Sequence, residues 1–556
     1  MASKGAEQTL FQQPDAMPPT SLSSADAPTM TSHADAKSEP PTSDPLRDLE
    51  SSGPECDSLT DSEIERLGRQ RPDVFSSGLK EVLFCSSLVI SFLMAEYFIS
   101  GFNIILPDLS RSLNIPPGSQ TWPASVFSLV TASFLLPLGR LADMYGAYPV
   151  FNFGLVWFFA WSLIAGFSTN YQMLIAARAL GGLGPAAFLP TSIMLIGKIY
   201  RPGPRKNIVF GLWSAFAPVG FYIGIIIGGA TTQLLTWRVY FWIGAGIMAV
   251  VSATAFVTVP NDMAATRKEN AHISMDWWGV ATIVPGLVML TFAITDGAHA
   301  PKGFATPYII ATCVCGVVFL AAAVYVEGWV AKQPLLPFDL FQAKYMKRLT
   351  VGLFFIYGIF GIFLFYGSVH ISNFMGATAL KTAVWFTPMA AGGLILACVG
   401  GFTLHLLPGR VLLIISGLGS MTCVLLFAVI PDDGGYWPFV FPAMVCATIG
   451  VDVSFLVSNI FITTNVPRHR QGVAGALINS LIFLGISFCL GLADLAVSES
   501  EKRVGDGKQH KVAFWLGTAC GATAVLIFTT IKIGKAKSEL TADEKARRAA
   551  AGEVVQ

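Results

Sequence analysis

The chain has 556 residues, of which 53% are hydrophobic and only 13% are charged, and its formal net charge is +1. A soluble protein of this size needs a more charged surface, and so neutral a balance gives no electrostatic reason to expect a nucleic-acid partner. Apolar runs of roughly 20 residues recur along most of the sequence, which is typical of a protein that crosses a membrane many times. We therefore predict an all-α integral membrane protein whose surroundings are the lipid bilayer.

The first 78 residues differ from the rest of the chain. They are rich in Ser, Pro, Asp and Thr and contain few large apolar side chains. Such a segment cannot bury enough apolar surface to offset the entropy lost on folding, so we predict a disordered cytosolic tail. No cleavable signal peptide is visible, because the first apolar run begins only near Val82.

Apolar segments long enough to span a bilayer follow one another along the remaining chain. Two of them come after a basic loop at Arg267 and Lys268 and separate six earlier segments from six later ones. The fourteen predicted spans are 82–106, 122–138, 149–167, 171–199, 208–230, 239–259, 277–294, 307–326, 349–371, 382–407, 411–430, 437–465, 473–497 and 512–533.

A weak internal repeat relates the first six spans to the last six. The Gly-Arg pair at 139–140 resembles the pair at 409–410, and the Pro-Arg pair at 204–205 resembles the pair at 467–468. Repeated halves are typical of secondary transporters, whose substrate site lies between the halves near the midplane. The predicted parts are the tail 1–78, a six-helix half 79–260, two inserted helices 261–330, a second six-helix half 331–534 and a cytosolic tail 535–556.

Lys and Arg predict the orientation of the chain. With the N-terminus inside, about 24 of them fall in cytosolic segments near the spans and about 8 fall outside, in agreement with the positive-inside rule. We therefore predict that both termini are cytosolic. The loop at 201–206 should then face the cytosol and the segment 499–511 should face outside.

Arg178 is the one charge in the run 172–196 of the fourth span. An arginine near the core of a span costs roughly 2.5–3.5 kcal/mol on insertion scales, so it needs a partner or a wet cavity. One interpretation is a structural arginine that donates to backbone carbonyls. The other is a buried charge in a transport pathway, which predicts a role in proton coupling.

Two spans carry polar stripes with a carboxylate. In the first span Glu96 is followed by Ser100, Asn103 and Pro107, and in the twelfth Asp452 shares a helix face with Thr448, Asn459 and Thr463. A polar stripe on an apolar span is expected to face the protein interior. Glu96 and Asp452 are thus predicted to take part in proton coupling, with Ser100, Asn103 and Asn459 lining the cavity. A protonated glutamate on a packing face is the alternative for Glu96.

Glycines mark two further stretches. Gly139 and Gly146 enclose Arg140 and Asp143 and predict a tight turn after the second span, with the carboxylate at a helix boundary. In the fifth span the small residues and a proline recur in a way that predicts a groove for close helix contact. These residues are Pro218, Gly220, Gly224 and Gly228.

These motifs resemble those of the major facilitator superfamily, and within it the fungal fourteen-span drug:proton antiporters of the aminotriazole-resistance type. The matching stretches are 139–146, 178–186, 217–229 and 276–279, and the resemblance extends over residues 80 to 535. It implies the major facilitator fold, a conformational role for the 139–146 motif, proton coupling through Arg178 and an antiporter motif around Pro218.

Some residues depart from the family pattern. Met144, Ala147 and Tyr148 stand where the family usually has basic residues, which leaves Arg140 as the nearest candidate partner of Asp143. In the fifth span Ala217 replaces the glycine expected before the proline.

The predicted function is secondary active transport, namely proton-coupled efflux of small organic compounds such as drugs, toxins or secondary metabolites. The alternative is proton-linked or facilitated transport of a small solute such as ammonium or borate. The proton gradient would be the energy source, with no cofactor and no metal, since the sequence has neither a Cys-x-x-Cys pair nor a Cys/His cluster.

No metalloprotease or paired-histidine motif lies in or beside the spans, so an enzyme is not expected. His370 is interpreted as a satisfied interfacial histidine. We expect a monomer in the plasma membrane, with the vacuolar membrane as an alternative.

Overall fold

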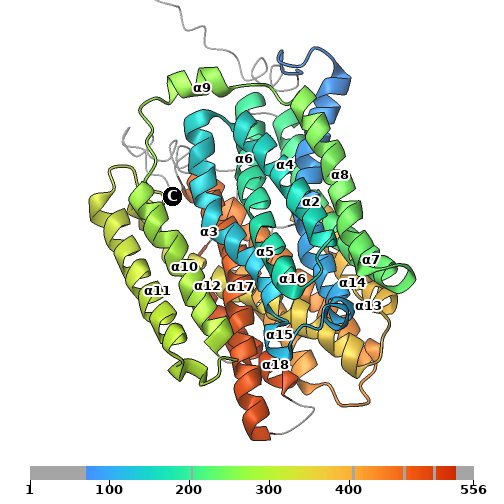
Figure 1. Ribbon diagram of the computed structural model, residues 1–556. Coiled ribbons are helices and arrows are strands. Elements are labelled where there is room, and N and C mark those ends of the chain that lie inside the picture. Colours follow the sequence, from blue (N-terminus) through green and yellow to red (C-terminus); the bar gives the residue numbers. More distant parts are fainter. Residues whose placement is uncertain are drawn as a thin grey trace, which may run out of the picture. The chain divides into compact units, whose positions relative to one another are not determined.

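The computed structural model describes residues 70–201, 204–297, 299–403, 407–466, 471–504 and 509–533 (Figure 1). Within these residues the chain is helical and contains no strand, and fourteen segments are long and apolar enough to cross a membrane. The all-α prediction is therefore confirmed. Most of the predicted N-terminal tail and all of the C-terminal tail lie outside the described residues.

The helices of the first half begin and end close to the predicted bounds. Two of them are capped by a side chain at their first turn: for α2 the Ser77 hydroxyl accepts from the Lys80 amide at 3.2 Å, and for α5 Asn170 Oδ1 accepts from the Met173 amide at 2.8 Å. The helices are α2 (Gly78–Ser112), α3 (Trp122–Tyr145), α4 (Ala147–Gly166), α5 (Tyr171–Gly181), α6 (Leu183–Ile199), α7 (Pro204–Leu234) and α8 (Trp237–Thr258), with a 3-10 turn at Pro117–Ser119. The predicted fourth span is thus two helices, α5 and α6, that meet at Gly182.

A short helix and an inserted pair follow. They are α9 (Met263–Glu269), α10 (Trp277–Gly297) and α11 (Pro307–Tyr325), with a 3-10 turn at Gly303–Ala305 and a π-helical turn at Val326–Val330. In Figure 1, α10 and α11 stand at the left edge of the bundle. α10 contacts α3 of the first half and α17 of the second, so the inserted pair packs against both halves.

The second half is built from α12 (Met346–Ile362), α13 (Ala379–Trp385), α14 (Thr387–Thr403), α15 (Gly409–Val429), α16 (Phe441–Asn465), α17 (Gln471–Val504) and α18 (His510–Thr529). A 3-10 turn lies at Phe338–Gln342, and π-helical turns lie at Phe363–Gly367, His370–Phe374 and Tyr436–Val440. α12 packs on α17 and α18, while α15 packs on α16 and α18.

Glycines bring α2 and α7 close together between residues 93–101 and residues 220–228. A Cβ on Gly220 would collide with the backbone of Leu93, one on Gly224 with that of Tyr97, and one on Gly228 with that of Gly101. The groove predicted from this glycine pattern is thus filled by α2, and α2 and α7 form the most extensive helix pair among the described helices.

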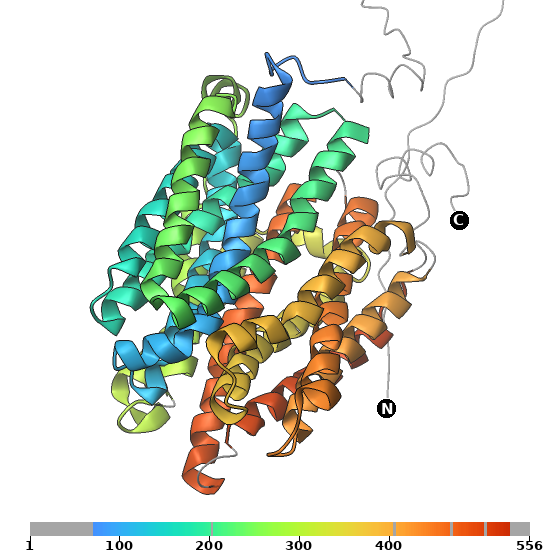
Figure 2. The same cartoon turned by 90° about the vertical axis from the view of Figure 1, so that its right-hand side faces the viewer.

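The two halves touch mainly through α3 with α17 and through α7 with α13 and α14. In Figure 2 the orange helices of the second half lie nearer to the blue and green helices at the lower end than at the upper end. The upper end carries the start of α2 and the end of α6, and the lower end carries the start of α3 and the last turns of α17. We call the first the α9 end, because α9 lies there, and the second the His299 end, after a residue in the connection between α10 and α11.

Candidate transport cavity

A cavity lies between the two halves and brings together the two carboxylates singled out in the sequence. Glu96 reaches it from α2 and Asp452 from α16, and both side chains are half-buried. Among the residues that the structure describes, two other polar side chains line it, Tyr357 of α12 and Asn479 of α17. The other described lining residues are all apolar, namely Phe92, Ile99, Ala217, Pro218, Phe221, Phe360, Met389, Ala390, Val451, Phe455, Ile482, Phe483 and Ile486.

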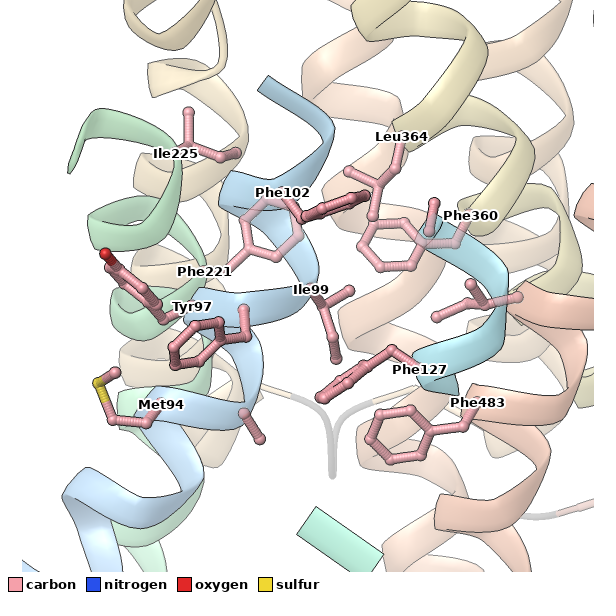
Figure 3. Packing of buried hydrophobic residues seen from close by; sticks show 14 of the residues in the cluster. Met94, Tyr97, Ile99, Phe102, Phe127, Phe221, Ile225, Phe360, Leu364 and Phe483 are labelled. Atoms are coloured by element: carbon pink, nitrogen blue, oxygen red, sulfur yellow. The ribbon is translucent and has the colours of Figure 1, made fainter. Parts of the chain in front are cut away.

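Aromatic rings from both halves form much of this wall. Phe221 of α7 and Phe360 of α12 face each other with ring centroids 5.8 Å apart. Figure 3 shows these rings with Ile99 of α2 and Phe483 of α17, each contributed by a different helix. Both halves therefore contribute apolar and aromatic side chains to the cavity, which suits a flat or apolar molecule.

Neither cavity carboxylate has a hydrogen-bond or ion-pair partner within the described part of the chain. A carboxylate that faces a mostly apolar space without a cation is costly to keep charged. Glu96 and Asp452 are thus available to a proton, to water or to a bound cation. The structure places both on the same cavity, as the two polar stripes predicted; their role in coupling stays a prediction.

Arg178 does not line this cavity. Its side chain is buried, with only 4% exposed, and donates to the carbonyls of Pro123 at 2.7 Å and Phe98 at 3.1 Å. Its guanidinium also lies over the rings of Phe102 and Phe127, at 3.8 and 4.8 Å from their centroids. This geometry matches the interpretation of a structural arginine that joins α5 to α2 and α3. Proton coupling through Arg178 stays a prediction.

The three residues expected to line the cavity beside the carboxylates are not among its lining residues within the described chain. Ser100 donates to the Phe221 carbonyl at 2.6 Å, because α7 crosses this face of α2. The side-chain amide of Asn103 donates to Ile99 of its own helix at 2.9 Å, and that of Asn459 donates to Phe455 at 2.8 Å.

The antiporter-motif helix α7 contributes to the cavity through Pro218 and packs through its glycines. A Cβ on Gly393 of α14 would lie 3.0 Å from both Asp452 Oδ2 and Pro218 Cβ. Gly393 therefore allows α14, α16 and α7 to converge beside the second carboxylate. Neither Gly393 nor Asn479 was singled out in the sequence, because a glycine pair or an asparagine in an apolar span does not reveal which neighbour it faces.

The 139–146 motif differs from its prediction in two respects. Gly139 and Asp143 lie in the last turns of α3, and only Gly146, with φ +99°, makes the turn. Arg140 does not pair with Asp143 in the described structure. It donates to the Ser274 carbonyl at 3.2 Å and to Gln333 Oε1 at 2.8 Å, so it ties α3 to the connections that flank the inserted helices.

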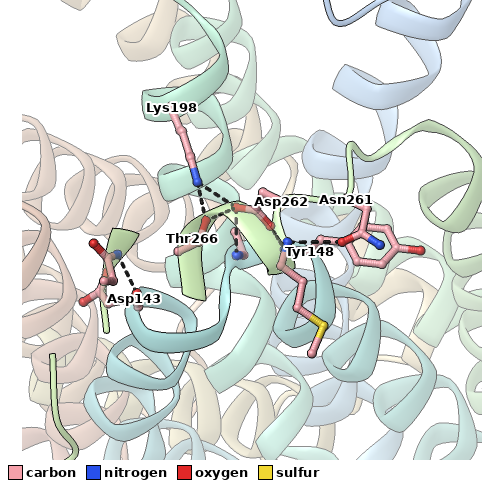
Figure 4. Close-up of polar contacts among 9 residues, drawn as sticks. Asp143, Tyr148, Lys198, Asn261, Asp262 and Thr266 are labelled. Carbon is pink, nitrogen blue, oxygen red and sulfur yellow. Dashed lines mark hydrogen bonds and ion pairs between the residues drawn. The ribbon is translucent and has the colours of Figure 1, made fainter. Parts of the chain in front are cut away.

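The side chain of Asp262, which precedes α9 and lies outside the 139–146 motif, contacts the first residues of α4 (Figure 4). Asp262 accepts from the backbone amides of Ala147 at 3.3 Å and Tyr148 at 3.1 Å, and from Lys198 Nζ of α6 at 3.1 Å. Burial alone would raise the pKa of Asp262, but these hydrogen bonds and the lysine charge lower it below the ordinary value. Lys198 and Asp262 thus supply an ion pair in the region where the sequence lacks the family's basic residues.

His370 is buried, and its Nδ1 lies 3.0 Å from Nε2 of His510. The ring of His370 also packs against Phe374 and Phe427. This environment agrees with the interpretation of a satisfied histidine near the end of its span.

Comparison with known proteins identifies the family. The Major Facilitator Superfamily model matches residues 88–489, so the chain belongs to that superfamily and is a multi-pass membrane transporter. The chain is 33% identical over 473 residues to the aminotriazole resistance protein of Saccharomyces cerevisiae, covering 82% of this chain and 85% of that protein. It is 31% identical over 426 residues to the low affinity ammonium transporter of the same yeast, covering 74% and 81%.

The efflux pump terJ of Aspergillus terreus is 28% identical over 474 residues, covering 83% of this chain and 89% of the pump. Among solved structures, the nucleoside transporter NupG matches with a TM-score of 0.54 and 13% identity, covering 82% of this chain and 99% of NupG. At that identity NupG supports the fold alone. The predicted fold and the resemblance to fungal transporters of the aminotriazole-resistance type are confirmed.

Proposed function

We propose that the chain is a proton-coupled exporter of small organic compounds, with the α9 end in the cytosol. The observation that carries the proposal is the pair Glu96 and Asp452. They come from opposite halves, face one cavity and lack a partner within the described residues. Proton binding and substrate binding at the same carboxylates would exclude each other, which is how an antiporter couples the two fluxes.

The lining of the cavity favours a compound with an apolar or aromatic body. Six of its side chains are aromatic, namely Phe92, Phe221, Tyr357, Phe360, Phe455 and Phe483. A compound that also carries a basic nitrogen could pair with Glu96 or Asp452 after proton release. The names of two relatives, an efflux pump and an aminotriazole resistance protein, support export of such compounds.

A small cation is the second candidate substrate. One relative of similar identity is named a low affinity ammonium transporter. Two carboxylates without a counter-charge in a narrow path would also suit ammonium. The aromatic wall favours the larger compound.

The orientation proposed here follows the excess of Lys and Arg at the α9 end, which includes Lys198, Arg267 and Lys268. The halves meet through α3 with α17 and through α7 with α13, close to the His299 end. In this orientation the molecule is closed toward the outside. We place it in the plasma membrane.

The proposal is tested in everted membrane vesicles, with radiolabelled aminotriazole and methylammonium as the two probes. An imposed pH gradient, acid inside, should drive accumulation of aminotriazole, and a protonophore should abolish it. Accumulation of methylammonium alone would favour the second candidate. Protein-dependent uptake of aminotriazole that ignores the protonophore would contradict the antiporter assignment and indicate a facilitator.

A further inference from the structure

A buried carboxylate outside the cavity connects three parts of the chain. Asp494, in the last third of α17, is 7% exposed. Its Oδ2 accepts from Thr121 Oγ1 at 3.1 Å and lies 2.9 Å from His299 Nε2. Its Oδ1 accepts from the Tyr366 hydroxyl at 3.4 Å. We call these four residues the Asp494 cluster.

Each partner of Asp494 belongs to a different part of the fold. Thr121 precedes α3 of the first half, His299 lies in the connection between α10 and α11, and Tyr366 lies in a π-helical turn of the second half. The cluster therefore joins the two halves and the inserted pair at the His299 end.

Close packing around the Asp494 cluster holds α3, α10 and α17 together. We call this contact region between the three helices the joint. A Cβ on Gly491, one turn before Asp494, would collide with Thr295 Oγ1 of α10. Trp122 at the start of α3 packs against Phe292 of α10 with ring centroids 5.4 Å apart. Any motion that opens this end of the molecule must separate α3 from α17 and so must break the bond from Thr121 to Asp494.

We propose that the Asp494 cluster is a second proton-binding site, in which a proton taken up by His299 from the outer solution favours closure of the outer end. In this proposal the connection that carries His299 stays with α3 when α3 and α17 part, so His299 and Asp494 lose their mutual contact and His299 can exchange protons with the outside. Once His299 is protonated, its imidazolium attracts the Asp494 carboxylate and draws the inserted connection and α17 together.

The charged groups around His299 all favour its protonated form. The hydrogen bond with Asp494 raises the pKa of His299 above its ordinary value, burial opposes this, and the charges of Asp494, Asp296 and Glu501 add to the increase. Asp296, at the end of α10, also accepts from the Tyr308 hydroxyl at 2.8 Å. Thr121 and Tyr366 both donate to Asp494.

The sign of the pH dependence follows from this increase. The pKa of His299 is higher in the closed joint than in the parted one, so proton uptake stabilises closure. That stabilisation is fully present below the ordinary histidine pKa of about 6.5 and is lost as the pH rises through the raised value. Acid outside would therefore return the transporter to the state that is open toward the cytosol. An antiporter that takes up protons from outside requires this step. The direction rests on the orientation proposed above.

The test measures a distance across the joint and needs no substrate. Spin labels are attached to Ser119→Cys before α3 and Ser500→Cys on α17, in a cysteine-depleted chain in nanodiscs. Pulsed dipolar spectroscopy then follows the distance between the labels from about pH 5 to about pH 9, on both sides of the ordinary histidine pKa. The short distance should gain population as the pH falls, and His299→Gln should abolish that shift.

Two variants keep the test specific. His272→Gln, which changes an exposed histidine near α9, should titrate like the parent. Glu96→Gln, which removes a cavity carboxylate, should also retain the pH-dependent change in distance. The test of His299 therefore does not depend on whether Glu96 and Asp452 couple transport to protons. A parent without a pH-dependent distance, or a His299→Gln variant that titrates like the parent, would overturn the proposal.

Discussion

Glu96 of α2 and Asp452 of α16 face one cavity from opposite halves of the molecule, and no described residue neutralises either. The two positions belong to different spans that are far apart in the sequence. Their meeting is a consequence of the fold, because α2 of the first half and α16 of the second both border the space between the halves. The functional proposal depends on this relationship more than on any single motif.

Arg178 provides a prediction that combines stability with transport. Arg178→Ala leaves the buried carbonyls of Phe98 and Pro123 without their guanidinium donor, which costs roughly 1–3 kcal/mol for each group left unpaired. We expect earlier thermal unfolding of the purified protein and loss of transport. Arg178→Lys should restore only part of both, since an ammonium cannot reproduce the planar fork of donors.

A matched control for this prediction is Arg111→Ala. Its side chain is 72% exposed and, within the described chain, pairs with Asp108 alone, on the same helix, so its removal should change the unfolding temperature little. If Arg178→Ala unfolds and transports like Arg111→Ala, then neither the structural nor the coupling interpretation of Arg178 holds.

The close contact between α2 and α7 predicts that one methyl group added at Gly224 destabilises the folded protein. In Gly224→Ala the new Cβ would meet the backbone of Tyr97, so the helices must separate. Overpacking of this kind typically costs about 1–3 kcal/mol. Gly246→Ala in α8 is the control, because a Cβ there meets nothing within 4 Å. The readout is the yield of folded protein and its unfolding temperature; equal values for the two variants would refute the close contact.

The contacts of Asp262 predict that the stability of the α9 end depends on pH. Because its pKa is lowered in the folded protein, its stabilisation is present above the ordinary aspartate value of about 3.9 and is lost as the pH falls through the lowered one. Asp262→Asn should therefore weaken protection of the backbone amides of Ala147 and Tyr148 at neutral pH, as measured by hydrogen exchange. Glu269→Gln on exposed α9 should not. Unchanged protection in the asparagine variant would argue against this role.

Accessibility of introduced cysteines tests the orientation. In a cysteine-depleted chain, Glu269→Cys should react with an impermeant maleimide only after permeabilisation, whereas Lys302→Cys, between α10 and α11, should react in intact cells. Labelling of Glu269→Cys in intact cells would invert the topology, and with it the direction of transport.

Much of the fold could be predicted from the sequence, because a span must be long and apolar whatever surrounds it. The bounds of α3, α4 and α8 differ from their predictions by few residues, apart from the inner end of α3, which continues through Asp143. That continuation is not visible in hydropathy, since polar residues at the membrane edge fit a helix as well as a loop. The break at Gly182 was missed for the opposite reason, because the apolar pattern runs through it.

The sequence could predict residues of the candidate site only where placing the side chain in an apolar span costs free energy. A carboxylate within an apolar span reveals itself, so Glu96 and Asp452 could be found. Ser100 could not be assigned correctly, because the stripe of α2 does not show that α7 covers part of it. Asp262 and His299 lie outside the spans, where charged residues are common. Asp494 lies within the predicted span 473–497 but has no polar stripe that was singled out, and only the three-dimensional contacts identify its partners.

The most direct test of the central claim is proton-driven transport by Glu96→Gln and Asp452→Asn, each of which keeps the shape of the side chain but cannot release a proton. In everted vesicles with labelled aminotriazole, both variants should still exchange the compound across the membrane, yet neither should concentrate it when the interior is acidic. Glu269→Gln should concentrate it like the parent. Accumulation by both cavity variants at the level of the parent, with the same sensitivity to a protonophore, would contradict the claim that these carboxylates couple transport to protons.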